Sequence, residues 1–455
     1  MTAHVAVFDI GKTNAKIGLV DLTTRTEIAV TTRPNRVLPG PPYPHYDTDA
    51  LWQFLTDGLR DLHSAHRIDA ISVTTHGAAA ALLAADGTLA APALDYEHDG
   101  PNSVVAAYDA IRPGFAETGS PRLGAGLNVG AQLHWQFQVD PGLRDRVATL
   151  VMWPQYWGFR LTGQRATDVT SIGCHADLWN PHTGQLSSLV DRLGLSGRIA
   201  PPRRPADLLG TLTPSVAALT GLPTSTPVVT GIHDSNAALL PHLLGRPAPF
   251  SVVSTGTWVV VMSVGGSAAM LDPARDTMIN TNALGQPVPS AKFMGGREHD
   301  LLRGAKPPAA TRDDAARVRD QGIMLMPSVV AGSGPYPDRA MHWLPGPPDD
   351  AAQEVAVGYY LALMTAECLS MTGGHGPVIV EGPFARNRHF LNMLAVATAR
   401  SVLVSPSQTG TAIGAALLFA DARNPPPQAE IAPQPVDPTL LPYAAAWRER
   451  VGRGN

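Results

Sequence analysis

The sequence predicts an α/β protein with two domains of similar architecture. At 455 residues the chain is too long for one ordinary hydrophobic core. A strand–turn–strand pattern opens the chain and recurs about one domain length later, which indicates a duplicated domain. In the second half, short apolar runs alternate with segments of helical periodicity, and this alternation is typical of a sheet with helices on both faces.

The first hairpin lies at the N-terminus. Residues 5–8 and 15–20 have the apolar pattern of buried strands, and residues 9–14 form a polar turn between them. Leucines at helical spacing across residues 48–66 predict a helix. The apolar run at residues 68–74 predicts a further strand, so the first domain mixes helices and strands.

The second hairpin opens the C-terminal domain, with strand-like residues 250–254 and 258–262 around a small polar turn. Beyond it, the pattern predicts a helix at 351–371 capped by Asp350, a strand at 377–381, a helix at 388–399, a strand at 401–404 and a helix at 411–421. The expected domains are residues 1–245, residues 246–423 and a terminal segment 424–455, whose Pro-rich part, residues 424–442, is expected to be extended.

Composition favours a folded protein that acts on small molecules. The net charge is −4, from 34 Lys and Arg against 38 Asp and Glu, whereas proteins that bind a nucleic-acid backbone usually carry a basic excess. The two cysteines, Cys174 and Cys368, form no metal-binding or disulfide pattern. We find no signal-peptide pattern and no apolar stretch long enough to span a bilayer. We therefore expect a cytoplasmic protein with no nucleic-acid or membrane partner.

The first polar turn has the residue types of a phosphate-binding loop. Gly11 exposes backbone N–H groups, Thr13 and Asn14 add side-chain donors, and Lys12 and Lys16 add positive charge.

Asp9 precedes this turn and has the chemistry to hold Mg²⁺ through water. A Walker A loop is excluded because Ala6 occupies the place of its first glycine and a strand follows the turn. An ordinary hairpin turn explains the same residues about equally well.

The second turn, residues 254–257, offers hydroxyls and N–H groups without charge, and on its own an ordinary turn is the better explanation. Paired with the first turn, it suggests a second phosphate clamp that includes Gly256 and Thr257.

Asp234 follows a buried strand and precedes a helix. A carboxylate at that edge of a sheet can accept the proton of a substrate hydroxyl in phosphoryl transfer, although an N-cap aspartate has the same pattern.

Two further segments are candidates for the site. Residues 380–387 run from a strand through Gly382 and Pro383 towards a helix that follows Asn387, which leaves room for a flat ligand such as a nucleobase. A plain strand–turn–helix connection is the alternative. Residues 295–299 are expected to form a flexible polar loop. The sequence leaves open whether this loop lines the ligand site.

Taken in order, the motifs resemble those of the FGGY carbohydrate kinases, in the superfamily of actin and hexokinase. The resemblance rests on residues 9–14 (DIGKTN), 76–77 (HG), 231–234 (GIHD), 254–258 (STGTW) and 410–412 (GTA), and it spans residues 5–420. It implies two ribonuclease-H-like domains around a cleft, with sugar bound mainly by the first domain and ATP mainly by the second.

The resemblance also implies residue roles. Asp234 matches the catalytic base, Asp9 the magnesium-associated aspartate, and His76, Gly77 and His233 the sugar site. The loops that contain Gly11, Lys12, Thr13 and Asn14, and Gly256 and Thr257, match the phosphate loops, while Gly382 and Asn387 fall near the adenosine.

The expected activity is ATP-dependent phosphorylation of a ketose, such as L-rhamnulose, L-fuculose or xylulose. The alternatives are a catalytically silent sugar or nucleotide sensor and an ATPase that acts on protein partners. A homodimer is the default expectation for such an enzyme.

Overall fold

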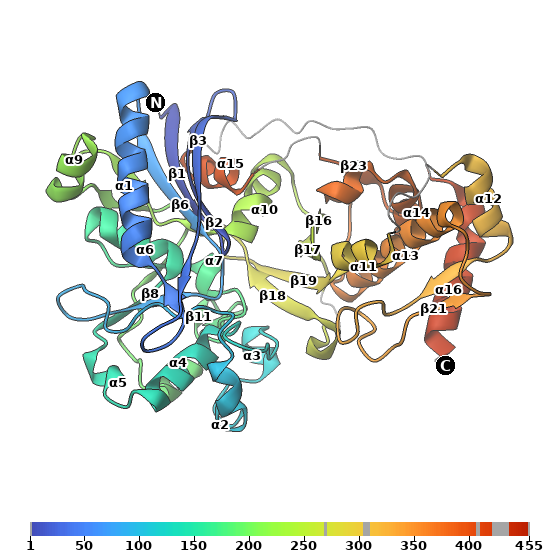
Figure 1. Cartoon of the computed structure of the whole chain (residues 1–455), viewed down its shortest axis with the longest axis horizontal. Helices are drawn as coiled ribbons and strands as arrows, with labels where there is room; N and C mark the ends of the chain where they lie inside the picture. Colours follow the sequence, from blue (N-terminus) through green and yellow to red (C-terminus); the bar gives the residue numbers. More distant parts are fainter. Residues whose placement is uncertain (1, 268–270, 304–309, 406–409, 421–435, 454–455) are drawn as a thin grey trace. The chain divides into compact units, whose positions relative to one another are not determined.

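The computed structural model describes residues 2–267, 271–303, 310–405, 410–420 and 436–453. Contacts within the chain divide it into two units, each with its own cores (Figure 1). Unit 1 consists of Met1–Arg246, Ile279–Pro287 and Thr409–Pro427. Unit 2 consists of Pro247–Met278, Val288–Gln408 and Gln428–Asn455.

The sheet of unit 1 has the strand order β13-β14-β6-β1-β2-β3, with β15 pairing with β6. The strands β1, β2 and β3 are antiparallel neighbours, whereas β1, β6 and β14 run parallel. Their bounds are β1 His4–Ile10, β2 Asn14–Asp21, β3 Thr26–Pro34, β6 Ala70–Thr75, β13 Leu208–Thr211, β14 Pro227–Val229 and β15 Ile232–His233.

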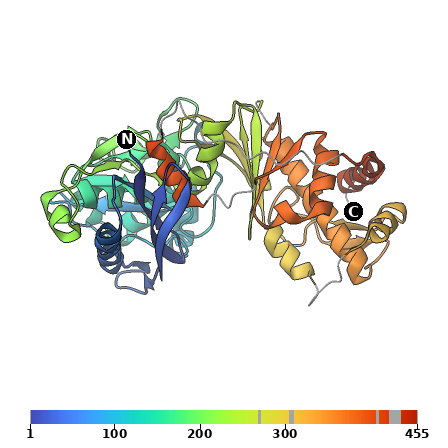
Figure 2. The same ribbon diagram turned by 90° about the horizontal axis from the view of Figure 1, so that it is seen from above.

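Alternation along β1 places helices on both faces of this sheet. Successive side chains of a strand point to opposite faces. Ala6 and Phe8 belong to one core, together with the leucines of α1 (Thr48–Ala65). Val5 and Val7 belong to a second core, together with α10 (Asp234–Gly245) and α15 (Thr411–Ala416). Figures 1 and 2 both show α15, in red, beside the blue strands of this unit.

A third core of unit 1 lies away from the main sheet and contains Leu133, Leu150 and Trp179. Its main elements are α4 Val129–Val139, the antiparallel pair of β7 Ala80–Leu83 and β8 Thr149–Met152, and α7 Val169–Ile172. The helix α6 (Trp153–Thr162) adds Trp153 and Trp157 to the core around α1. These tryptophans are fully buried, so they serve packing.

The second sheet repeats five strands of the first in the same order, with β23-β22-β16-β17-β19 in the places of β14-β6-β1-β2-β3. Its order is β18-β19-β17-β16-β22-β23, with β16, β17 and β19 antiparallel and β16, β22 and β23 parallel. The bounds are β16 Phe250–Thr255, β17 Val259–Val264, β18 Thr277–Thr281, β19 Pro287–Phe293, β22 Val378–Glu381 and β23 Val402–Val404. The predicted duplication of an α/β domain with ribonuclease-H-like strand order is confirmed.

The helices of unit 2 surround one large core. They are α11 Gly295–Leu302, α12 Arg312–Asp320, α13 Asp350–Met371, α14 Arg388–Thr398 and α16 Leu441–Arg453. The helix α13 is capped by Asp349, whose side chain accepts from the backbone N–H of Ala352, and not by Asp350 as expected. Most residues of α13 are buried because the helix crosses the middle of this core.

The structure corrects three further expectations. Residues 295–299, predicted as a flexible loop, begin the helix α11, which the buried Glu298 anchors to Tyr360. The helix expected at 411–421 ends at Ala416 and continues as a 3-10 turn, Leu417–Phe419. Of the segment expected to be extended, residues 424–435 lie outside the described part, and the remainder forms a 3-10 turn, Pro438–Leu440, and the start of α16.

In the part of the chain that the structure describes, none of the helices combines the length and apolar character that crossing a bilayer requires.

Candidate active site

Asp234 lies where the chain leaves the sheet of unit 1. It is the first residue of α10 and directly follows β15, which pairs with the C-terminal end of β6. The N-cap of α10 is His233 and not Asp234. The alternative interpretation of Asp234 as an N-cap residue is therefore wrong. Its Oδ1 accepts a hydrogen bond of 2.6 Å from the backbone N–H of Ser235, and 31% of its side-chain surface is exposed. Asp234 is therefore an accessible carboxylate at the edge where α/β sheets bind ligands.

His233 holds one oxygen of Asp234. Its Nε2 lies 3.2 Å from Asp234 Oδ1, and its ring is buried. The ring packs directly against Gly77, where a methyl group in place of a hydrogen would lie 2.7 Å from the same Nε2. Burial lowers the pKa of His233 to about 4, so the ring is neutral near pH 7 and its Nε2 proton can be donated to Asp234. The histidine thus orients the carboxylate.

His76 presents an unused acceptor. It follows β6, and its Nδ1 lies 2.8 Å from the carbonyl oxygen of Gly77. Burial is the main cause that lowers the pKa of His76 to about 4. In the neutral ring Nδ1 therefore donates to Gly77, and the buried Nε2, which has no hydrogen-bond partner among the described residues, is left as an acceptor. A substrate hydroxyl has the chemistry to supply that bond.

The surroundings also make Asp234 a stronger base than an ordinary aspartate. Removal from water raises its pKa above the usual 3.8, and this effect outweighs the opposing influence of His76 and of the hydrogen bonds from Ser235. A carboxylate with a raised pKa is still ionised near pH 7 and holds a proton more readily.

A buried polar network supports this region, and the sequence did not predict it. Asp168 is completely buried, caps α7, and accepts from the backbone N–H of Thr170 at 2.8 Å and from its hydroxyl. The hydroxyl oxygen of Thr170 accepts from the backbone N–H of His233 at 3.0 Å. Gln155 donates to Asp168 at 3.1 Å and to the carbonyl of Thr230 at 3.0 Å. The one signal in the sequence was Asp168 with Thr170 and Ser171 two and three residues later, which is typical of a helix N-cap.

The first turn is held in shape by Asn35. Its Nδ2 donates to the carbonyl of Gly11 at 2.8 Å, and its backbone N–H donates to the carbonyl of Thr13 at 2.9 Å. Both carbonyls are thereby bound on one side of the turn, while the side chains of Thr13 and Asn14 are exposed.

Asp9 lies in the buried strand β1, close to two polar groups. The hydroxyl of Thr411 donates to its Oδ2 at 2.5 Å, and Lys16 Nζ lies 4.0 Å from the same oxygen. Burial raises the pKa of Asp9. One carboxylate beside a hydroxyl fits Mg²⁺, which keeps several waters and takes only one or two protein carboxylates. No group of three or more His, Cys, Asp or Glu side chains is arranged as a metal site within the described ranges.

Lys12 is paired with carboxylates. Its ammonium forms ion pairs with Asp95 and, at 3.2 Å, with Glu97. It also lies 5.0 Å from the ring centre of Tyr96 and 5.6 Å from that of Tyr46. The side chain of Lys12 is thus engaged by carboxylates, whereas the side chains of Thr13 and Asn14 in the same turn are exposed.

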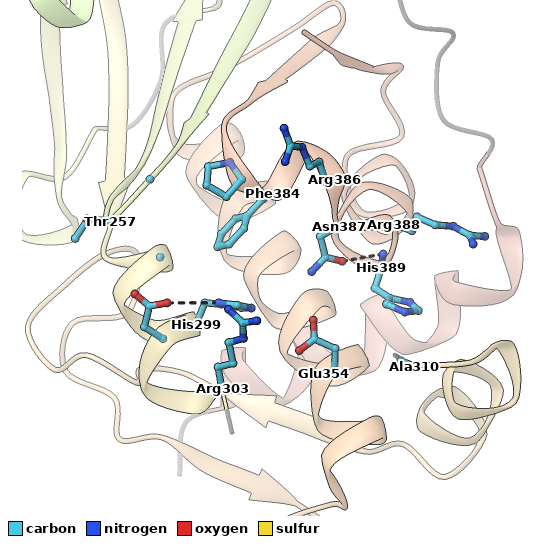
Figure 3. Close-up of a pocket in the computed structure, with 14 residues that line it drawn as sticks. Thr257, His299, Arg303, Ala310, Glu354, Phe384, Arg386, Asn387, Arg388 and His389 are labelled. Atoms are coloured by element: carbon cyan, nitrogen blue, oxygen red, sulfur yellow. Dashed lines mark hydrogen bonds and ion pairs between the residues drawn. The ribbon is translucent and has the colours of Figure 1, made fainter. Parts of the chain in front are cut away.

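Unit 2 contains a pocket with a volume of about 720 Å³ (Figure 3). The second turn contributes Gly256 and Thr257, and the first turn of α11 contributes Gly296. A methyl group at Gly296 would lie 1.8 Å from the carbonyl oxygen of Gly256, so this close approach of helix and turn requires glycine. Phe384 and Asn387 line the middle of the pocket (Figure 3). The volume is in the range of cofactor sites.

Gly382 and Asn387 shape the pocket from the end of β22. Gly382 has a φ of +82°, and a methyl group there would lie 2.0 Å from the carbonyl oxygen of Thr255. Asn387 caps α14: its Oδ1 accepts from the backbone N–H groups of His389 and Phe390, both at 3.0 Å. The strand–turn–helix connection and the pocket are therefore built by the same residues, and the amide nitrogen of Asn387 remains as a donor.

Comparisons with known proteins agree with this architecture. Residues 4–241 match the N-terminal domain of the FGGY family of carbohydrate kinases, and residues 247–428 match the FGGY C-terminal domain. The chain belongs to the FGGY family of carbohydrate kinases. The resemblance inferred from the motifs is confirmed.

Several solved structures resemble this FGGY kinase over its whole length. A carbohydrate kinase from Novosphingobium aromaticivorans is 35% identical, with a TM-score of 0.92 and 99% of both chains covered. A xylulose kinase from Rhodospirillum rubrum has a TM-score of 0.76, with 99% of this chain and 98% of that chain covered. Its identity of 21% shows the fold alone.

Curated relatives match a smaller part. L-fuculokinase of Salmonella typhi is 28% identical over 266 residues, which is 57% of this chain and 56% of that protein. A probable L-xylulose kinase of Pasteurella multocida (strain Pm70) is 29% identical over 56% of this chain and 55% of its own length. The chain thus spans just over half the length of the curated relatives it matches.

Proposed function

We propose that this FGGY kinase transfers the γ-phosphoryl group of ATP to a hydroxyl of a ketose, with Asp234 as the general base. The observation that carries the proposal is the accessible Asp234 carboxylate, which lies 3.2 Å from the neutral ring of His233 at the carboxyl edge of the sheet. The ketose class, with L-rhamnulose, L-fuculose and xylulose as examples, is supported by relatives named L-fuculokinase, L-xylulose kinase and rhamnulokinase.

In the proposed reaction, Asp234 accepts the proton of the attacking hydroxyl. The oxygen of that hydroxyl forms its bond to phosphorus as the bond to the β,γ-bridging oxygen breaks, and ADP leaves. When bound, ATP supplies the phosphoryl group, and Mg²⁺ offsets part of the negative charge of the phosphates. His233 keeps Asp234 oriented, and His76 Nε2 accepts a hydrogen bond from the sugar. Gly77 allows the His233 ring its close approach.

The remaining candidate residues are assigned to the nucleotide. Asp9 would hold Mg²⁺ through water, because its carboxylate and the neighbouring Thr411 hydroxyl suit that ion. The phosphate contacts are proposed for Gly11, Thr13, Asn14 and Lys16 of the first turn and for Gly256 and Thr257 of the second. Gly382 and Asn387 would border the adenosine in the 720 Å³ pocket.

The test is an ADP-release assay with Mg-ATP and a panel of ketoses, aldoses, polyols and glycerol, comparing the wild type with Asp234→Asn. The amide keeps the shape of the carboxylate but cannot accept the proton, so we expect a loss of kcat of about 10²- to 10⁴-fold. Sugar binding, followed by thermal shift, should persist. Asp61→Asn, which makes the same change at an exposed aspartate of α1, is the matched control.

Full activity of Asp234→Asn would overturn the assignment of the base. Sugar binding without turnover by the wild type on any member of the panel would favour the silent-sensor alternative.

A further inference from the structure

The side chain of Lys12, expected at the phosphates, is engaged by two carboxylates in the structure. Its ammonium is held between Asp95 and Glu97, and only 16% of the Lys12 side chain and 9% of the Asp95 side chain are exposed. To bind a phosphate, Lys12 would have to leave Asp95 as a buried carboxylate without a counter-charge, which is strongly unfavourable. The ion pair therefore keeps Lys12 where the structure has it.

The carboxylate that holds Lys12 is itself fixed. Asp95 Oδ1 accepts from the backbone N–H of Glu97 at 3.2 Å and from the hydroxyl of Tyr46 at 3.4 Å. The backbone N–H of Asp95 donates to the carbonyl of Pro44 at 3.0 Å. Because these contacts hold Asp95, the ammonium of Lys12 is also held in place before a ligand binds. Such a preorganised donor favours a ligand whose acceptor atom lies opposite it.

Aromatic rings connect Lys12 to the base. Its ammonium lies over Tyr96, and the rings of Tyr96 and His76 are 5.3 Å apart. The charges of Lys12 and of Asp234 both act on His76, in opposite directions. Lys12 is therefore connected through Tyr96 to His76, one of the residues proposed to bind the sugar.

Lys12 and Glu97 each retain hydrogen-bonding groups that a ligand can use. An ammonium has three donors, of which one goes to Asp95, while Glu97 is an ion-pair partner of Lys12 at 3.2 Å. Glu97 is 63% exposed, so its carboxylate retains acceptor sites for a ligand. A donor beside an acceptor is the arrangement that recognises two neighbouring hydroxyls. The two carboxylates outnumber the one ammonium, which disfavours an anionic ligand such as a sugar acid.

We propose that Lys12, with Asp95 and Glu97, forms a subsite that recognises the hydroxyls of a neutral sugar, and that Lys12 is a specificity-determining residue. The proposal rests on the kinase function proposed above. Lys12 donates to one hydroxyl of the sugar, and Glu97 accepts from its neighbour. Lys16, in the same hairpin and beside Asp9, keeps the phosphate role.

The experiment compares Lys12→Met with Lys16→Met in steady-state kinetics on the ketose that the wild type turns over fastest. Loss of a charged hydrogen bond predicts that Lys12→Met raises the KM for the sugar roughly 10- to 100-fold. The KM for ATP should stay within about twofold, and Lys16→Met should show the opposite pattern. A raised KM for ATP with an unchanged KM for the sugar in Lys12→Met would overturn the proposal.

Two additions keep the result decisive. If Lys12→Met does not fold because Asp95 is left unpaired, Lys12→Met combined with Asp95→Asn removes both charges and is expected to show the same rise in KM. Calorimetric titration of the same sugars without nucleotide tests the subsite independently of turnover, with weaker binding expected for the variant. Failure of the wild type to phosphorylate any sugar while it binds one in a Lys12-dependent way would contradict the kinase proposal alone. No binding of any sugar to the wild type would overturn the subsite.

Discussion

At Gly77 the lack of a side chain decides where the imidazole of His233 can lie. The ring occupies the space that a Cβ would take, and the same Nε2 orients Asp234. A methyl group at this position must therefore displace the ring and with it the base.

We expect Gly77→Ala to lower kcat by about tenfold or more with little change in thermal stability, because small misplacement of a reacting group is costly. Steady-state kinetics and thermal unfolding measure the two effects. Gly124→Ala is the matched control, since a Cβ there meets nothing within 4 Å. Equal kcat values for the two variants would contradict this role for Gly77.

The pH dependence of activity should report Asp234 and neither histidine. The pKa of Asp234 is raised above 3.8, so kcat/KM should fall as the pH is lowered through that raised pKa and the base becomes protonated. His76 and His233, each with a pKa of about 4, stay neutral above about pH 5.5. A profile of kcat/KM for the sugar from about pH 4.5 to 8.5 checks this. A limb near the ordinary histidine value of 6.5 would show that one of the rings titrates in the working range.

At the same scale, sequence reasoning proposed Asp234 and Asp9 because each carboxylate lies beside the end of a strand, and it proposed His233 through the family resemblance. It did not reach the Asp168 network, since a buried capping aspartate looks the same in the sequence as an exposed one. Nor could it place Lys12, because the composition of a turn does not say towards which neighbour a long side chain bends. The partner, Asp95, is distant in sequence and is brought close only by the fold.

Among the elements, α10 and α15 approach each other very closely. A Cβ at Gly414 of α15 would lie 1.8 Å from the carbonyl oxygen of Ala237 in α10, the helix that begins with Asp234. The two helices can approach this closely only because residue 414 is glycine.

We expect Gly414→Ala to lower the free energy of unfolding of unit 1 by about 1–3 kcal/mol, as overpacking does, and to reduce kcat by shifting α10. Chemical denaturation and kinetics measure both. Gly410→Ala changes the N-cap of the same helix, where a Cβ meets nothing within 4 Å, and should cost less than about 1 kcal/mol. A Gly414→Ala protein as stable as Gly410→Ala would mean that α15 does not need this approach.

The sequence predicted most elements whose apolar period was clear, such as α1, α13 and both hairpins. Several helices were not predicted, and α11 and α16 show why. The helix α11 has paired glycines and charged residues that resemble a loop, and its buried Glu298 is stabilised by Tyr360, which no local pattern reveals. The helix α16 follows a Pro-rich segment, although Tyr443, Trp447 and Val451 have the four-residue spacing of a buried helical face.

For the molecule as a whole, each unit has its own core, so each should unfold as a separate cooperative body. The helix α16 completes the core of unit 2. Its Trp447 is 1% exposed and donates to the carbonyl of Leu325 at 2.8 Å.

We expect Trp447→Ala to destabilise unit 2 by about 3–5 kcal/mol, the usual effect of emptying a buried tryptophan site. Differential scanning calorimetry should show one transition at lower temperature and the other unchanged. Leu441→Ala, at a residue of α16 that is 52% exposed, is the control. If both transitions moved together in Trp447→Ala, the two units would not unfold independently.

The same strand order in both sheets was foreseeable at this scale from two hairpins with small polar turns. The assignment of chain segments to the units was less accessible. The small residues of α15 are typical of close helix packing, but a period of small residues does not identify the partner helix. The partner, α10, lies far away in the sequence.

The return of residues 409–427 to unit 1 has a consequence for the order of synthesis. Because a chain leaves the ribosome from its N-terminus, the strands and α10 of unit 1 emerge long before α15 does. During that interval Val5, Val7 and Leu240 lack the helix that covers them in the finished protein. The nascent first unit therefore exposes an apolar face while the second unit is translated, and a chaperone that binds such faces would hold it open until α15 arrives.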